Sequence, residues 1–364
     1  MTVVLKNALV DSKLVDIEIS DGKIEKIGKS DDNAGIDLGG RKVFAGLVDI
    51  HTHGCVGYDT MDGDGLLQMS EFLLKNGVTA WLPTTMTMDI KTIKGVTNAT
   101  LADTSGARIL GYHMEGPYIS PKYKGAQNER FIKSPDLDEF KSLSNVKKIT
   151  IAPELHKSME FIKNCDCVVS LGHTDADYDC AMEAFKNGAK CLTHTFNAMP
   201  PLHHRNAGPI GAAIDSDAYV EVICDGLHIH RSVIKMLYRT FGADRMILIS
   251  DSMRATGLSD GEYEFGGQMI TVKDSVARTA DGAIAGSTST LLDCVKKAIE
   301  FGIPERDAFK MASETPATLI GVNKGKIEVG YDADLIVTDD NYNVVLAIIG
   351  GKVQNTQFIK RIDD

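Results

Sequence analysis

The sequence of 364 residues lacks several features that mark whole classes of protein. No apolar run reaches the roughly 18–20 residues that a helix needs to cross a bilayer. The N-terminal segment MTVVLKNALVDSK becomes polar too early to be a secretory signal. Internal repeats and low-complexity tracts are also missing. These absences argue against a helical membrane protein and favour a globular, cytoplasmic one.

An excess of basic residues is absent as well. The chain has 39 Lys and Arg against 50 Asp and Glu, which gives a formal net charge of −11. Nucleic acids and anionic membranes attract cationic surfaces, so we expect neither as a partner. The balance still allows a small anionic substrate that a few local cations hold.

The cysteines form no C-x-x-C pair. Seven are scattered along the chain, namely Cys55, Cys165, Cys167, Cys180, Cys191, Cys224 and Cys294. An odd, scattered set is typical of reduced thiols in a cytoplasmic protein. The C-x-C at Cys165 and Cys167 is compatible with a soft metal pair, but packing beside the following strand explains it as well.

Hydrophobic residues make up 43% of the chain, enough for a large core. Both ends consist of short alternating runs separated by Asp and Gly turns, at 3–10, 14–20 and 23–28 and again at 326–329, 334–337 and 344–349. Neither end is large enough to form a core alone. We therefore expect residues 1–42 and 325–364 to combine into one small β-sandwich domain.

Residues 43–324 alternate strand-like and helix-like runs. The expected strands are 43–49, 79–83, 109–114, 148–152, 167–171, 189–193, 219–224 and 246–250. The expected helices are 66–76, 89–103, 175–187, 232–241, 288–301 and 305–320. Eight buried strands alternating with helices fit an α/β fold of the (β/α)₈ TIM barrel type better than an open doubly wound sheet.

Polar residues gather where these strands end, which is where a TIM barrel carries its chemistry. The segment LVDIHTHG ends on His51 and His53, which share a face because strand side chains alternate. Further strand ends carry His113, Glu115, His173, His194, His228 and Asp251. A single such histidine is usually a hydrogen-bonded core residue. Six on one rim would leave unpaired groups at about 1–3 kcal/mol each, so we predict a metal that satisfies several together.

The motifs VDIHTHG, HMEGPY, LGHT, THTFNAM and ISDSM together resemble the N-acetylglucosamine-6-phosphate deacetylase family of the amidohydrolase superfamily. The likeness covers nearly the whole chain and includes GKIEVGYDADLIV at 325–337. HMEGPY and THTFNAMPP are specific to this branch, whereas H-x-H marks only the superfamily.

The resemblance implies Glu115, His173 and His194 as the principal metal ligands and Asp251 as the catalytic general acid/base. Some family members lack the first-strand histidines and bind one metal, while others keep them and hold two. This chain keeps His51 and His53, so one or two Zn²⁺ or Fe²⁺ ions per subunit are both open. No lysine ends the fourth strand, at 151–154, so Glu115 replaces the carbamylated lysine that bridges two metals elsewhere in the superfamily.

The resemblance also implies substrate contacts. The expected set comprises Ala126 and Gln127, Asn197 and Ala198, the loop Asp225, Gly226, Leu227 and His228, the segment Ile284, Ala285 and Gly286, and Arg205. Arg205 and His228 would grip a phosphate, and 284–286 would line the acetyl end. In the family the arginine reaches the neighbouring subunit's site, which implies a homodimer.

The implied reaction is hydrolysis of the N-acetyl amide of N-acetyl-D-glucosamine 6-phosphate to D-glucosamine 6-phosphate and acetate. A metal-bound hydroxide would be the nucleophile, and Asp251 would take its proton and deliver it to the departing amine. The alternatives are an N-acetylgalactosamine-6-phosphate deacetylase, a cyclic-amide hydrolase or deaminase, and a non-catalytic amidohydrolase-like scaffold. Arg205 and His228 argue against the second, and the complete ligand set argues against the scaffold.

Overall fold

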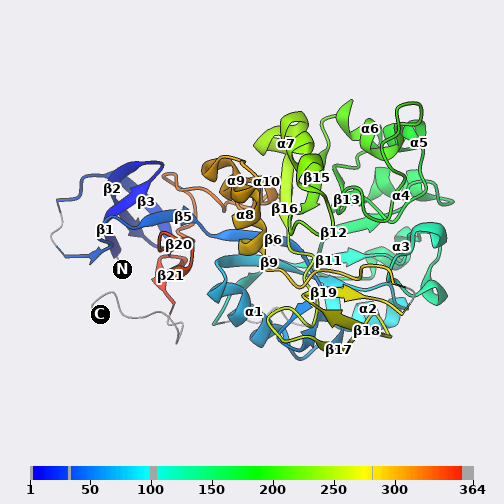
Figure 1. Cartoon of the computed structure of the whole chain (residues 1–364), viewed down its shortest axis with the longest axis horizontal. Helices are drawn as coiled ribbons and strands as arrows, with labels where there is room; N and C mark the ends of the chain where they lie inside the picture. The colour runs from blue at the N-terminus through cyan, green and yellow to red at the C-terminus, as the bar shows by residue number, and fades with distance from the viewer. Residues whose placement is uncertain (1–2, 32–33, 99–104, 281, 355–364) are drawn as a thin grey trace.

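The computed structural model describes residues 3–31, 34–98, 105–280 and 282–354. A large barrel surrounded by helices lies beside a smaller sheet that both ends of the chain build (Figure 1). Within the described residues, no helix combines the length and the apolar character needed to span a bilayer.

The barrel consists of eight parallel strands. They are β6 (Leu47–Thr52), β9 (Val78–Thr85), β11 (Tyr112–Glu115), β12 (Val146–Ile151), β13 (Val168–Leu171), β14 (Cys191–Leu192), β15 (Tyr219–Ile223) and β16 (Met246–Ile249). Each strand pairs with the next, and the short β10 (Arg108–Ile109) also pairs with β9. The last strand returns to the first, because the amide of Asp251 donates to the carbonyl of His51 over 2.9 Å. The predicted (β/α)₈ barrel is confirmed.

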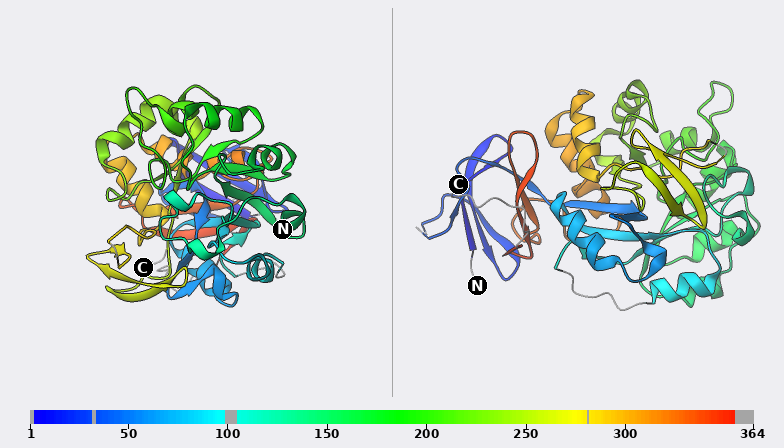
Figure 2. Two further views of the ribbon diagram at one scale, coloured as in Figure 1. Left: turned by 90° about the vertical axis from the view of Figure 1, so that its right-hand side faces the viewer. Right: turned by 60° about the horizontal axis from the view of Figure 1, so that its bottom comes forward.

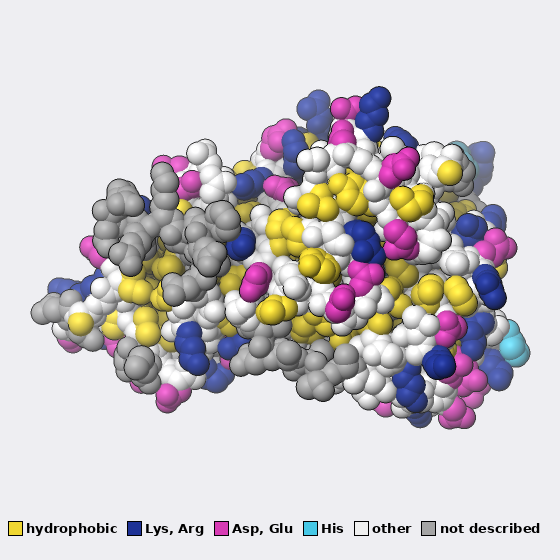
Figure 3. Space-filling model, turned by 90° about the horizontal axis from the view of Figure 1, so that it is seen from below, with side chains coloured by type: hydrophobic (Ala, Val, Ile, Leu, Met, Phe, Trp, Pro, Cys, Tyr) yellow, Lys and Arg dark blue, Asp and Glu magenta, His cyan; other side chains and the backbone are white. Residues whose placement is uncertain are grey.

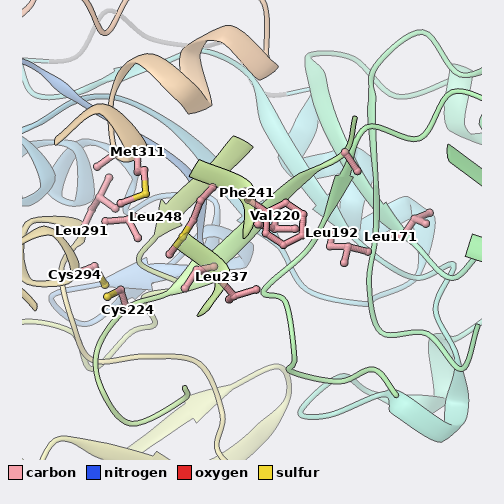
Figure 4. Close-up of a cluster of buried hydrophobic side chains, with 14 of the residues drawn as sticks. Leu171, Leu192, Val220, Cys224, Leu237, Phe241, Leu248, Leu291, Cys294 and Met311 are labelled. Atoms are coloured by element: carbon pink, nitrogen blue, oxygen red, sulfur yellow. The ribbon is translucent and has the colours of Figure 1, made fainter. Parts of the chain in front are cut away.

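Helices cover the outside of this barrel. They are α1 (Leu66–Lys75), α2 (Ile90–Thr97), α3 (Leu137–Lys141), α4 (Ser158–Asn164), α5 (Tyr178–Lys186), α6 (Gly208–Ile214), α7 (Arg231–Arg245), α8 (Leu291–Glu300), α9 (Glu305–Met311) and α10 (Glu314–Leu319). Leu192, Val220 and Leu248 of the strands belong to the same buried cluster as Leu237 of α7 and Leu291 of α8 (Figure 4). Each such leucine stabilises the fold by roughly 1.5–3 kcal/mol when fully buried, so the outward faces of the strands fix the helices.

The smaller sheet joins the two ends of the chain. Its strands are β1 (Val3–Val10), β2 (Lys13–Ser20), β3 (Lys23–Gly28), β4 (Ile36–Asp37), β5 (Lys42–Ala45), β20 (Leu335–Thr338), β21 (Val344–Ile349) and β22 (Lys352–Val353). Their order is β22-β21-β20-β5-β1-β2-β3, with β4 on β1. The N-terminal and C-terminal strands face each other (Figure 2), and Leu5, Ile17, Leu335 and Ile348 share one core. The two ends therefore combine as expected.

The first barrel strand begins later than expected. Val43 lies in β5, where it pairs with Val337 of β20, so the expected strand 43–49 is in fact two strands. The chain passes between them at Gly46, where a Cβ atom would lie 2.7 Å from the Cβ of Thr79. The expected helix 305–320 is likewise split, because Ser313 leaves helical geometry at φ −135° and ψ −77°. Of the expected helix 89–103, residues 99–103 lie outside the described part of the chain.

One sheet was not expected from the sequence. Strands β17 (Gly261–Phe265), β18 (Gln268–Lys273) and β19 (Val276–Arg278) form an antiparallel unit between β16 and α8. The side-chain amide of Gln268 donates to the carbonyl of Ala126 over 2.7 Å, which fastens this unit to a loop beyond β11. The remaining short elements are β7 (Gly54–Cys55), β8 (Tyr58–Asp59), η1 (Thr60–Asp62), η2 (Pro121–Tyr123) and η3 (Glu129–Phe131).

Candidate metal and active site

Six polar side chains meet at the carboxyl ends of the barrel strands. His51 and His53 end β6, Glu115 ends β11, His173 and His194 follow β13 and β14, and Asp251 follows β16. The Nε2 atoms of His173 and His194 are 3.1 Å apart, and those of His51 and His53 are 3.3 Å apart. Residues distant in sequence thus come together as predicted.

Glu115 lies between the two histidine pairs. Its Oε1 is 3.2 Å from His194 Nε2 and 3.3 Å from His51 Nε2, and its Oε2 is 3.2 Å from His53 Nε2. Two ligand groups result, His51–His53–Glu115 and Glu115–His173–His194, each with its donor atoms within 4.8 Å of one another. Glu115 belongs to both groups.

The hydrogen bonds of the histidines fit a divalent metal. Nδ1 of His173 lies 2.8 Å from the carbonyl of Tyr123, and Nδ1 of His194 lies 3.2 Å from the carbonyl of Asn197. A carbonyl only accepts, so each Nδ1 carries a proton, and this leaves Nε2 as the nitrogen whose lone pair can face its neighbour. Lone pairs that face one another need a Lewis acid between them. The residues at this site therefore fit a divalent ion.

The backbone is strained at three of these positions. His173, His194 and Asp251 have φ values of 46°, 28° and 47°, in the left-handed region that non-glycine residues rarely adopt. Such geometry costs about 1–3 kcal/mol per residue and persists where the surroundings enforce it. Here the carbonyls of His173 and Asp251 each accept a 2.7 Å hydrogen bond, from the amides of Ser120 and Ser287. The strain turns the side chains into the barrel mouth.

Opposite charges shift the pKa values in this cluster. Burial would raise the pKa of Asp251, but His51 and His53 outweigh it and lower the pKa to about 2, so the carboxylate is ionised. Burial would lower the pKa of His51, but Asp251 and Glu115 raise it to about 9. At His53, Asp251 and Glu115 likewise outweigh burial and raise the pKa to about 10. A cation that binds here would displace these protons, because a ligating imidazole must give up its second proton.

A cavity of about 430 Å³ opens above these residues. Of the expected substrate contacts, it is lined by Ala126, Gln127, Asn197, Ala198, His228, Ile284 and Gly286. Its lining also includes residues that sequence reasoning missed, namely Lys122, Tyr123, Gly125, Ile223, Phe265 and Ala283. Phe265 comes from the unexpected sheet and packs edge-on against His53, with ring centroids 5.4 Å apart.

Five expected contacts do not line the cavity. Ala285 is fully buried in an apolar cluster, Leu227 is 51% exposed, and Gly226 packs near Phe301. Asp225 is turned towards His228. Arg205 lies in an exposed loop that a bridge between His203 and Asn206 closes.

Gln127 holds the carboxylate of Glu115 in place. Its side-chain amide donates to Glu115 Oε2 over 2.7 Å, and its Oε1 accepts from the amide of Thr87 over 2.7 Å. Because Thr87 fixes the orientation of the Gln127 amide, the amide fixes the Glu115 carboxylate.

His228 and Asp225 form a buried pair at the cavity wall. His228 Nδ1 lies 2.7 Å from Asp225 Oδ2, and Asp225 Oδ1 accepts from the amides of Leu227 and His228. Burial would lower the pKa of His228, but Asp225 outweighs it and raises this pKa. The pair therefore favours a positive imidazolium that faces the cavity.

The placement of His113 on the same rim is wrong. The ring of His113 lies 4.5 Å from that of His51, with Nδ1 3.2 Å from Thr84 Oγ1 and Nε2 2.8 Å from Thr150 Oγ1. Burial holds its pKa well below the usual range, so the ring is neutral. Two hydroxyl groups satisfy both nitrogens, and neither ligand group includes this histidine.

A buried ion pair beneath the ligands also escaped sequence reasoning. Lys148 of β12 contacts Glu221 Oε1 of β15, and both side chains are fully buried. Glu221 Oε2 lies 3.3 Å from His51 Nδ1. The sequence did carry a signal for the inward position of Lys148. Ile149 and Ile151 lie on the outward face of β12, and because strand side chains alternate, Lys148 lies on the inward face.

Comparison with known proteins agrees with this geometry. Residues 43–354 match the Amidohydrolase family. The N-acetylglucosamine-6-phosphate deacetylase of Bacillus subtilis (strain 168) is 39% identical over 85% of this chain and 84% of its own length. The N-acetylgalactosamine-6-phosphate deacetylase of Escherichia coli O157:H7 is 33% identical over 84% of this chain and 86% of its own.

A solved structure leads to the same group. The crystal structure of N-acetylglucosamine-6-phosphate deacetylase from Thermotoga maritima superimposes with a TM-score of 0.89 at 36% identity, over 96% of this chain and 99% of that one. The strand-end ligands, the confirmed barrel and these similarities agree. The chain belongs to the amidohydrolase family and, within it, to the N-acetylglucosamine-6-phosphate deacetylases.

Proposed function

We propose that this chain hydrolyses the N-acetyl amide of N-acetyl-D-glucosamine 6-phosphate, releasing acetate and D-glucosamine 6-phosphate. The observation that carries the proposal is the convergence of Glu115, His173, His194 and Asp251 on one cavity. Its family relatives named for this reaction support the choice of substrate.

The chain's own residues supply the proton chemistry. A divalent ion held by Glu115, His173 and His194 would polarise the acetyl carbonyl and lower the pKa of a water molecule to about 7. Asp251 is ionised beside His51 and His53, so it can accept a proton from the attacking water. The same carboxyl then returns the proton to the departing nitrogen, which leaves as an amine.

Two basic residues in the cavity lining suit a phosphate. His228 is held towards its cationic form by Asp225, and Lys122 lies at the wall with its Nζ 2.8 Å from Asp175. Arg205 adds a permanent positive charge that can bind phosphate through two parallel hydrogen bonds. Because Arg205 is exposed and lies outside this cavity, we propose that it serves the site of a second subunit in a homodimer.

Acetate release from matched sugars tests the reaction. Purified enzyme loaded with one metal is assayed on N-acetylglucosamine 6-phosphate, its galactosamine epimer and unphosphorylated N-acetylglucosamine. We expect the first to be hydrolysed with the highest kcat/KM. Equal rates on the phosphorylated and unphosphorylated sugars would contradict the phosphate contacts, and no acetate from any of them would contradict the function.

A second candidate is the galactosamine epimer as the preferred substrate. One relative, at 33% identity, is named for that activity. The same assay decides between the epimers, because they differ at one hydroxyl group and share the acetyl and phosphate ends.

We further propose Zn²⁺ or Fe²⁺ as the native ion, one or two per subunit. Imidazole and carboxylate ligands suit both metals, and metal supply then decides between them. A cytoplasmic location is proposed as well, because the seven cysteines are free thiols, as a reducing compartment favours.

A further inference from the structure

The buried pair of Lys148 and Glu221 makes one contact towards the metal site. Glu221 bonds Lys148 through Oε1 and faces His51 Nδ1 through Oε2 at 3.3 Å. On the other side of the same ring, His51 Nε2 lies 3.3 Å from Glu115 and 3.3 Å from His53. A line of contacts therefore runs from Lys148 through Glu221 and His51 to the ligand group at the end of β6.

Packing alone does not account for this pair. The side chains of Lys148 and Glu221 are fully buried. Replacing a buried ion pair by apolar residues of similar volume often leaves stability unchanged or raises it. Neutral hydroxyl groups also fill part of the barrel interior, since Thr150 and Ser170 both hydrogen-bond Thr193. A charged pair at this depth therefore indicates a role beyond filling the barrel.

The Nδ1 partner of His51 differs from those of the other pair. His173 and His194 are oriented by backbone carbonyls of Tyr123 and Asn197. His51 is oriented by a carboxylate, and His53 Nδ1 has no hydrogen-bond partner among the residues that the structure describes. The His51–His53 position thus depends on a single side chain for its orientation. A carboxylate there also makes the ring a stronger ligand.

We propose that Glu221, balanced by Lys148, is the positioning residue that makes the group His51–His53–Glu115 a second metal position. Glu221 accepts the Nδ1 proton of His51, fixes the tautomer and aims the lone pair of Nε2 at the barrel mouth. Lys148 supplies the positive charge that keeps a carboxylate in the barrel interior. This inference rests on the proposed metal-dependent function, and it predicts two ions per subunit.

Metal titration of the apoprotein tests the proposal. Co²⁺ is added to chelator-treated protein, and bound metal is counted by mass spectrometry while the visible absorption is recorded. We expect two binding steps in the wild type. Glu221→Leu should lose one step and bind one ion, and Glu221→Gln, which keeps an acceptor but loses the charge, should weaken that step by about 10- to 100-fold. The step that belongs to Glu115, His173 and His194 should not change.

Two further variants separate positioning from folding. Lys148→Met with Glu221→Leu removes both charges, so the fold stays free of an unpaired buried charge while the second step should still be lost. Lys324→Met is the matched control, because Lys324 is 6% exposed and pairs with buried Asp334 in the smaller sheet, 2.6 Å away. It should lower stability and leave both metal steps intact.

The outcomes divide clearly. One metal step in the wild type, or two steps of wild-type affinity in the double variant, would overturn the inference. Two wild-type steps without acetate release would leave the inference standing and contradict the proposed function instead. A wild type that binds one ion and still releases acetate would overturn the inference and support the proposed function.

Discussion

At the scale of single residues, Asp251 illustrates how this barrel prepares a side chain for chemistry. Its backbone sits at φ 47°, and its Oδ1 lies 3.4 Å from Nε2 of both His51 and His53. These histidines keep the carboxyl ionised, with its pKa lowered to about 2. In the metal-free protein, the proposed proton acceptor is thus held in its basic form across the neutral range.

Asp251→Asn removes this proton acceptor and keeps the shape. We expect kcat to fall by about 10²–10⁴-fold, the range typical of a lost general acid or base. Bound metal should stay near the wild-type amount, because Glu115, His173 and His194 remain. Asp244→Asn, at a side chain that is 82% exposed, is the control. Wild-type turnover in Asp251→Asn would show that another group moves the proton.

The pair of Asp225 and His228 predicts a pH-dependent stability. The pKa of His228 is raised from 6.5, so its contribution is complete below 6.5 and is lost as the pH rises through the raised value. The pKa of Asp225 is lowered from 3.8 because His228 and backbone amides outweigh burial, so its contribution is present above 3.8 and is lost at lower pH.

Asp225→Asn should therefore destabilise the protein most between pH 3.8 and the raised pKa of His228. The expected loss is about 1–3 kcal/mol, the usual value for a hydrogen bond with a charged group. Urea unfolding of wild type and variant over a series of pH values measures the difference. We expect it to shrink as the pH rises above the raised pKa of His228. A constant difference across the series would mean that the pair is not ionised in the folded protein.

Some residue roles could be read from the sequence, and others could not. Strand periodicity placed His51 and His53 on one face, and the position at a strand end pointed to Glu115, His173, His194 and Asp251. The same reasoning misplaced His113, because two threonine hydroxyls on neighbouring strands satisfy its nitrogens. The partner of Lys148 was also hidden, since which strand faces which across a closed barrel depends on its tilt and stagger.

At the scale of elements, the junction between β5 and β6 joins the smaller sheet to the barrel. Gly46 occupies this junction, and its amide donates to the carbonyl of Asp334 over 2.9 Å. The Thr79 side chain of β9 fills the space that a side chain at position 46 would need. Close packing at Gly46 therefore links β5 and β6 to β9.

Gly46→Ala should lower the free energy of unfolding by about 1–3 kcal/mol, the usual cost of overpacking a filled site. Gly95→Ala is the matched control, because Gly95 lies exposed inside α2 with no atom near a new Cβ. That change should stabilise by about 0.5–1 kcal/mol, since alanine favours a helix. Thermal unfolding of both variants gives the comparison, and a tolerated alanine at position 46 would show that Thr79 can move aside.

The eight barrel strands were predictable because most of them carry several buried apolar residues. The sheet β17–β19 was not, since its strands are half exposed, with a burial pattern along Gln268–Lys273 in which only Ile270 and Val272 are buried. Such a unit has no core of its own and is stabilised by the barrel loops it contacts. The split between α9 and α10 likewise depends on packing against neighbouring elements, which local sequence does not record.

At the scale of the whole molecule, surface charge and the proposed homodimer bear on which partners the protein binds. Acidic and basic side chains are interspersed over the face seen from below (Figure 3), in a chain whose formal net charge is −11. Composition could predict this much. It could not predict whether Arg205 serves the proposed second subunit, because an exposed arginine in a loop looks the same whether it faces solvent or a second site.

Co-expression of two inactive variants tests the shared site. In a mixed dimer of Arg205→Ala and Asp251→Asn subunits, one site would have both residues and the other neither. We expect each variant alone to be nearly inactive on the phosphorylated sugar at low concentration, and a random mixture to recover about a quarter of wild-type activity. Arg306→Ala, at a side chain that is 79% exposed, replaces Arg205→Ala in the control.

A mixture no more active than its parents would place Arg205 in its own subunit's site or outside both. The molar mass from light scattering should show a dimer in every sample, so a monomer would contradict the arrangement directly.

The strand order of the smaller sheet determines when this sheet can be completed during translation. Because β5 lies between β1 and β20, the strands that leave the ribosome first have an open edge until the last ones emerge. The barrel is translated after β5 and before β20, so it can close before the open edge of β5 is paired. Completion of the sheet thus follows translation of the barrel, and a product that ends before β20 would carry an unpaired edge on β5 that could join another polypeptide.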